Sequence, residues 1–139
     1  MQPSGRAPAG PRGVVGAAAE SAAVAYLQQA GWTVLARNVR VNADEIDILA
    51  SEPGSVGVLV LVEVRSTSTS RFGSAAESVD ARKVGRLYRA AGVLRRQGLA
   101  LLGMPGGAPT LTRVDLVTLR RVRGGRWSVE DHLRGLAPP

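Results

Sequence analysis

The chain has 139 residues, 45% of them hydrophobic, and a formal net charge of +7 at pH 7. This length is typical of one domain with a single core. The absence of cysteine excludes zinc fingers, disulfides and thiol nucleophiles, and the single histidine excludes multi-histidine metal sites. His132 itself is expected at the surface. The few aromatic residues argue against binding of single strands by base stacking.

The basic excess predicts a polyanionic partner, with nucleic acid as the first candidate. The basic residues are 17 Arg and one Lys, Lys83, which indicates a general preference for arginine. No apolar run is long enough to span a membrane, and the N-terminal segment lacks the order of a signal peptide. A cytoplasmic protein without a membrane partner is therefore expected.

The N-terminal region predicts a tail and then a helix. Residues 1–13 are rich in Pro, Gly and Ala and are expected to be disordered. Residues 14–30 are alanine-rich and predict a helix that Gly31 ends. Glu20 lies on one of two competing apolar stripes of this helix. A buried carboxylate must be paired or bound to a cation, so Glu20 is a candidate site residue.

The densest chemistry lies in a predicted β-hairpin. Its strands, over residues 46–50 and 58–64, are rich in β-branched residues and flank the polar turn SEPGSVG. A symmetric hairpin sets Asp47 opposite Glu63. Directly opposed like charges destabilise an antiparallel pair, so a cation is needed between them. Either a divalent metal or a neighbouring guanidinium such as Arg65 can meet this need.

The rest of the chain predicts three more strands and a second helix, which together form one domain over residues 14–134 with a short tail over 135–139. A polar loop over residues 66–73 follows the hairpin and can close over a ligand or simply connect two elements. Before the hairpin, a strand over 32–36 ends at a polar turn of Arg37 and Asn38. After it, a helix over 81–97 is capped by Asp80 and ended by Gly98, and a connector over 99–110 is interrupted by Gly and Pro. The last elements are a strand over 111–122, a Gly124-Gly125 turn and a short strand over 127–129.

Basic side chains gather at two places. The helix over 81–97 contains no acidic residue, and because like charges repel on a helix, its basic row suggests contact with phosphate groups. A plain solvated face is the alternative. The row comprises Arg82, Lys83, Arg86, Arg89 and Arg96. The second group surrounds the glycine turn and comprises Arg120, Arg121, Arg123 and Arg126.

Two converging carboxylates, a third acid from a helix and an adjacent cation suit Mg²⁺ or Mn²⁺, which prefer oxygen ligands. On a basic surface, the expected substrate is a phosphodiester, which the metal would polarise while it activates water. Arg65 follows Glu63 by two residues, so it lies on the same strand face and can orient water or a phosphate oxygen.

Five segments, GAAAESAAVAYL, DEIDILA, LVEVRS, FGSAAESV with Lys83, and RVDLVTL, occur in the order and spacing of the YraN family, and the chain resembles this family over roughly residues 13–133. These small bacterial proteins are related to Holliday-junction resolvases. The resemblance implies a three-layer α/β restriction-endonuclease-like fold, with a central mixed sheet of about five strands flanked by helices. A homodimer is an attractive assembly for a resolvase, which has two cuts to make.

The family is similar to the PD-(D/E)-x-K nucleases, which cleave phosphodiesters with a divalent metal. This implies that Asp47 and Glu63 are metal ligands, that Glu20 supports the metal shell and that Arg65 replaces the lysine of the pattern. Structured or branched DNA is the implied substrate. Asp44 stands where the family usually has glycine.

Other functions are compatible with the same residues. Arginine stays protonated and cannot act as a base, so a non-cleaving nucleic-acid-binding module is the main alternative to a nuclease. Lys83 could instead reach the site from its helix and supply the missing amine. A weaker alternative is a protein-interaction domain whose arginines meet an acidic partner.

Overall fold

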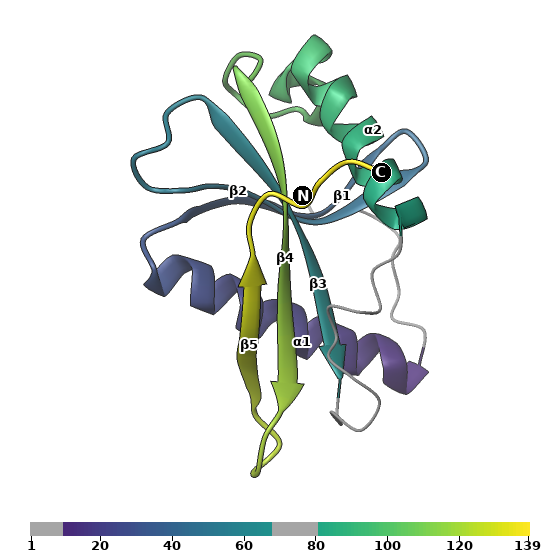
Figure 1. Ribbon diagram of the computed structural model, residues 1–139, viewed down its shortest axis with the longest axis vertical. Coiled ribbons are helices and arrows are strands. Elements are labelled where there is room, and N and C mark those ends of the chain that lie inside the picture. Colours follow the sequence, from purple (N-terminus) through teal and green to yellow (C-terminus); the bar gives the residue numbers. More distant parts are fainter. Residues whose placement is uncertain (1–9, 68–80) are drawn as a thin grey trace.

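The computed structural model describes residues 10–67 and 81–139. Most of the predicted N-terminal tail, most of the polar loop after the hairpin and the Asp80 cap lie outside these residues. The elements in chain order are α1 (Gly10–Gln29), β1 (Thr33–Val41), β2 (Asp44–Ser51), β3 (Val58–Thr67), α2 (Ala81–Gln97), the 3₁₀ helix η2 (Leu99–Leu102), β4 (Leu111–Arg121) and β5 (Trp127–Leu133) (Figure 1).

The five strands form one mixed sheet in the order β1-β2-β3-β4-β5. Strands β1, β2 and β3 form an antiparallel meander, β3 and β4 are parallel, and β5 returns antiparallel to β4. The parallel pair requires a crossover, which α2 and η2 provide. The predicted three-layer α/β architecture, a central mixed sheet of five strands flanked by helices, is confirmed.

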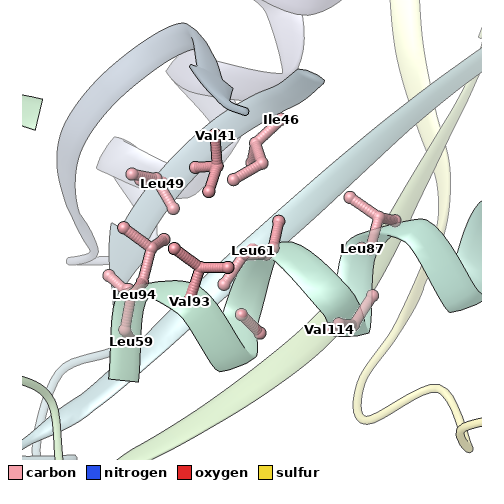
Figure 2. Close-up of a cluster of buried hydrophobic side chains, with 11 residues drawn as sticks. Val41, Ile46, Leu49, Leu59, Leu61, Leu87, Val93, Leu94 and Val114 are labelled. Carbon is pink, nitrogen blue, oxygen red and sulfur yellow. The ribbon is translucent and has the colours of Figure 1, made fainter. Parts of the chain in front are cut away.

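Each helix covers a separate hydrophobic cluster. Buried residues of α1, including Val24 and Leu27, pack with Val60 and Val62 of β3. On the other face, α2 packs its buried stripe on β2, β3 and β4. The labelled side chains of this second cluster, shown in Figure 2, are Val41, Ile46, Leu49, Leu59, Leu61, Leu87, Val93, Leu94 and Val114.

Both helices end where the sequence predicts. At the end of α1, Gly31 has φ 90°, its N–H donates to Gln28 O at 3.0 Å, and the Trp32 N–H donates to Leu27 O at 3.0 Å. This is a Schellman motif, which glycine favours because it adopts positive φ without strain. The start differs, because α1 begins at Gly10, inside the predicted tail. Neither of the described helices is long and apolar enough to cross a membrane.

The predicted turn at Arg37 and Asn38 is wrong, because β1 runs through both residues to Val41. The polar pair instead marks a local irregularity in the strand: Asn38 has φ 52°, a conformation that asparagine tolerates better than most residues. At the other terminus, β5 extends to Leu133. Beyond it, the Leu136 N–H donates to Val114 O at 2.8 Å, and Leu136 O accepts a hydrogen bond from the Tyr88 hydroxyl, so the predicted C-terminal tail packs on the domain.

Candidate active site

The candidate site lies where the ladder between β2 and β3 ends. The last paired residues are Ile48 and Val62, and continuing this register sets Asp47 opposite Glu63, as the sequence predicts. At this point, the Val64 N–H donates to Asp47 Oδ2 at 2.9 Å. The Asp47 side chain thus takes a hydrogen bond that a backbone carbonyl would accept in a continued ladder.

Glu63 is the most deeply buried carboxylate of the site, with 4% of its surface exposed. Burial, followed by the nearby charge of Asp47, raises its pKa to about 7, against the opposing effects of Lys83 and Arg65. Burial also raises the pKa of Asp47, against its hydrogen bond from Val64 and the charge of Lys83. The pair therefore retains a proton well above the usual range of a carboxylic acid.

Two cations from different elements flank Glu63. Arg65 Nε lies 3.0 Å from Glu63 Oε2, and Lys83 Nζ, from the first turn of α2, lies 3.6 Å from Glu63 Oε1. The Lys83 side chain is 19% exposed, so it is turned toward the domain rather than into solvent. The sequence analysis gave two positions for Lys83, the phosphate-contacting row and the carboxylate site, and the structure brings its ammonium group to the carboxylates.

Two buried atoms of this group lack a hydrogen bond. In the described part of the chain, neither Glu63 Oε1 nor Arg65 Nε has a hydrogen-bond partner, because the Arg65 N–H does not point at the nearby carboxylate oxygen. A buried carboxylate oxygen without a donor is costly. It is also an oxygen that a cation can bind, so this atom fits the metal that the sequence predicts.

Glu20 lies near this pair but is bound to other residues. It is buried, and Glu20 Oε1 accepts hydrogen bonds from Asn38 Nδ2 at 2.8 Å and from Arg37 at 3.3 Å. Burial, followed by the charge of Asp47, raises the pKa of Glu20. The three acids are therefore electrostatically linked across α1, β2 and β3.

The three predicted ligands do not close around one point. Among residues 10–67 and 81–139, no group of three or more His, Cys, Asp and Glu side chains is arranged to hold a metal ion. Mg²⁺ needs only one or two protein carboxylates, because it keeps several waters and takes other oxygens from a phosphate. Asp47 and Glu63 are enough to satisfy this requirement, so Glu20 is not needed as a direct ligand.

The basic row of α2 is partly neutralised by a neighbouring strand. Arg89 donates two hydrogen bonds to Asp44, from Nε at 2.9 Å and from Nη2 at 2.7 Å. These bonds, more than the charge of Arg86, lower the pKa of Asp44. The acid that relieves Arg89 comes from β2, so a search for acids within the helix misses it. Arg82 is exposed and Arg86 is half-buried.

A second buried polar group, around His132, was not predicted. The His132 side chain is only 7% exposed; its Nε2 lies 2.9 Å from Asp115 Oδ2 and its Nδ1 lies 2.9 Å from the Tyr26 hydroxyl. The expectation of a surface histidine is therefore wrong. Asp115, which is fully buried, also accepts two hydrogen bonds from Arg113. The sequence signal for this network is a carboxylate inside the apolar strand LTRVDLVTL, which must find partners.

Comparison with known proteins establishes the family. The sequence pattern of Uncharacterised protein family UPF0102 matches residues 19–119. The chain belongs to the UPF0102 family. This confirms the predicted YraN-like membership, and the matched range includes Glu20, Asp47, Glu63, Arg65 and Lys83.

Relatives from distant bacteria agree with this assignment. A UPF0102 protein of Mycolicibacterium vanbaalenii is 40% identical over 128 residues, 91% of this chain and 95% of that protein. One from Deinococcus radiodurans is 46% identical over 82 residues, 58% of this chain and 65% of that protein. The structure of Pyrococcus furiosus SfsA in complex with Ca²⁺ aligns with 89% of this chain and 64% of its own, at 14% identity and a TM-score of 0.41; so weak a likeness carries no argument about activity.

Proposed function

We propose that this UPF0102 protein is a metal-dependent nuclease that hydrolyses phosphodiester bonds in structured or branched DNA. The observation that carries the proposal is the pairing of the half-buried Asp47 with the buried Glu63 where β2 and β3 separate. Two neighbouring carboxyl groups, beside a lysine and an arginine, are costly to remove from water. A structural role does not require them, whereas a catalytic metal site does.

Asp47 and Glu63 would hold Mg²⁺ or Mn²⁺, with Glu20 acting at longer range through its charge. A bound divalent cation would supply Lewis-acid polarisation of the phosphodiester and activation of water. Glu63 contributes the oxygen that lacks a hydrogen bond, and Asp47 is held in position by the Val64 N–H. Binding requires the pair to release its proton, so metal affinity should rise with pH.

Arg65 and Lys83 divide the role that a single lysine plays in the PD-(D/E)-x-K pattern. The guanidinium of Arg65 stays charged and presents a fork of donors, which suits it to hold a phosphate oxygen. An ammonium group can lose its proton, and Lys83 approaches Glu63 from α2 rather than from the strand. We therefore assign Lys83 the amine role at this site and Arg65 the phosphate-holding role.

The arginines of α2 would bind the DNA backbone beside the site. Arg82 and Arg86 lie on the same helix as Lys83, within one turn of it. Arg89 belongs to the predicted phosphate-binding set as well, although its bonds to Asp44 fix its guanidinium in place. Phosphate contacts of this kind position a nucleic acid without reading its sequence.

The direct test is cleavage of branched, single-stranded and duplex DNA in Mg²⁺ or Mn²⁺. The parent protein should cut, with a preference for branched DNA, and Asp47→Ala and Glu63→Ala should each lose at least a hundredfold in rate. Asp131→Ala, which removes an exposed carboxylate of β5, is the matched control and should retain full activity. Cleavage that persists in both site variants would come from a contaminating nuclease and would reject the assigned site.

One observation favours a second function, a non-cleaving nucleic-acid-binding module. Glu63 already has two cationic neighbours, Arg65 and Lys83, so the site can persist without metal. In that case, the protein would bind DNA equally well in EDTA and in Mg²⁺, and no variant would change cleavage. An Arg65→Lys variant that gains activity would show that arginine at this position had abolished cleavage.

A further inference from the structure

The hairpin between β4 and β5 carries a dense positive charge. Residues 120–126 read RRVRGGR, with four arginines and no acid. All four side chains are exposed. The turn is well defined: the Val122 N–H donates to Arg126 O at 2.8 Å, and Gly124 and Gly125 have φ of 90° and 81°. The glycines therefore fix a tight turn that presents the arginines outward.

The hairpin arginines differ in their partners, and Arg120 lies 3.8 Å from the Glu130 carboxylate of β5. Arg113 is bound to Glu52 and Asp115, and Arg89 is bound to Asp44. At the hairpin, neither Arg123 nor Arg126 has an ion-pair partner among the described residues. Arg121 stacks on the Trp127 ring at 5.6 Å, which holds its guanidinium without neutralising it. Such uncompensated repulsion is expected where an external anion balances it.

The hairpin lies at the same end of the sheet as the candidate site. Strands β3 and β4 are parallel, with Glu63 paired to Leu116 and Arg65 paired to Thr118. Arg121 follows Leu116 by five residues, which is roughly 16 Å along the strand at about 3.3 Å per residue. In Figure 1, the hairpin projects past α1 at the lower end of the molecule, in the direction in which both strand arrows point. A span of 16 Å corresponds to about five base pairs of duplex.

We propose that the β4–β5 hairpin is a second nucleic-acid contact, which binds the backbone phosphates of a duplex arm about five base pairs from the site. The choice of ligand rests on the proposed function. A duplex arm would reach the hairpin only if the DNA is bound with its scissile bond at Asp47 and Glu63. The contribution that we assign to the hairpin is contact with backbone phosphates, which is electrostatic and independent of sequence.

The test measures binding in EDTA, so that cleavage plays no part. Arg123→Ala/Arg126→Ala should weaken binding of a long duplex by roughly tenfold at low salt and make the slope of log K against log salt shallower by about 1.8, because two phosphate contacts are lost. The matched control is Arg95→Ala/Arg134→Ala, which has the same change in net charge. Its residues lie at the end of α2 and just after β5, toward the opposite end of the sheet. The hairpin double should melt at the temperature of the parent protein, and the control double, which removes the exposed ion pair of Arg134 with Glu52, should melt within a few degrees of it.

Arm length distinguishes a specific contact from a general loss of charge. On branched DNA with arms shorter than about five base pairs, the hairpin variant should bind like the parent, since the arm no longer reaches Arg121. An equal loss on short and long arms, or an equal loss in the control double, would overturn the proposal. A parent that binds long arms through the hairpin but never cleaves would leave this contact standing and reject the nuclease function. If the hairpin variant cleaves branched DNA as fast as the parent, the nuclease function stands and the hairpin contact is rejected.

Discussion

Replacing Glu63 with glutamine should change how the stability of the protein depends on pH. The native carboxyl has a pKa of about 7, raised from an ordinary value of 4.5 by burial and by Asp47. Because the native state binds this proton more tightly than the unfolded chain, it holds more protons between pH 4.5 and about 7. The free energy of unfolding therefore falls as pH rises through this window. The full difference corresponds to about 3 kcal/mol.

Urea denaturation from pH 4.5 to 8 measures this effect without any activity assay. The parent should lose about 3 kcal/mol of stability across the window, whereas Glu63→Gln, which cannot ionise, should follow a much shallower profile. Mg²⁺ should raise the stability of the parent more at pH 8 than at pH 5, because it competes with the proton, and should leave Glu63→Gln almost unchanged. Parallel pH profiles for the parent and Glu63→Gln would refute the raised pKa of Glu63.

Three further changes test neighbouring contacts. Asp47→Ala leaves the Val64 N–H without its acceptor and should cost about 1–3 kcal/mol in urea denaturation, whereas Asp47→Asn keeps an acceptor and should cost less. Asp115→Ala breaks the buried group around His132 and should cost about 3–5 kcal/mol; because the pKa of Asp115 is lowered from 3.8 to about 2, its stabilisation is present above pH 3.8 and is lost as pH falls toward 2. Lys83→Arg retains the charge but not a titratable amine, so kcat should fall at least tenfold while DNA binding, measured by anisotropy, is retained; unchanged kcat would reject the amine role.

Local signals predicted most of the fold. The apolar stripe of α2, together with Gly98, defined a helix whose bounds agree with the structure, and the turn SEPGSVG set the register of β2 and β3. These features depend on residues close in sequence. The polar pair Arg37-Asn38 misled the prediction because its side chains bind Glu20 from an adjacent helix, and a single sequence does not reveal such tertiary partners.

The site was predicted in part for the same reason. Strand alternation and hairpin symmetry brought Asp47 opposite Glu63, and an arginine two residues later had to share its face. The position of Lys83 depends on how α2 packs across the sheet, which periodicity does not determine. The pairing of Arg89 with Asp44 likewise joins residues 45 positions apart. His132 was misjudged because its burial depends on the long-range packing of β5 against α1.

In the proposed nuclease, the charges around Glu63 would link the metal to the substrate. Arg65 and Lys83 balance the two carboxylates when both are ionised, so a divalent ion that takes the place of the retained proton would leave the site with an excess of positive charge. A phosphodiester is the anion that can restore the balance. Metal and DNA should therefore each increase the affinity of the site for the other, since coupling between two ligands is reciprocal. Because the Arg65 guanidinium does not lose its proton, its positive charge remains, whereas a lysine at this position could lose its charge by deprotonation. Arginine would thus favour binding of the phosphate, and release of the cleaved product is the step that it should slow most.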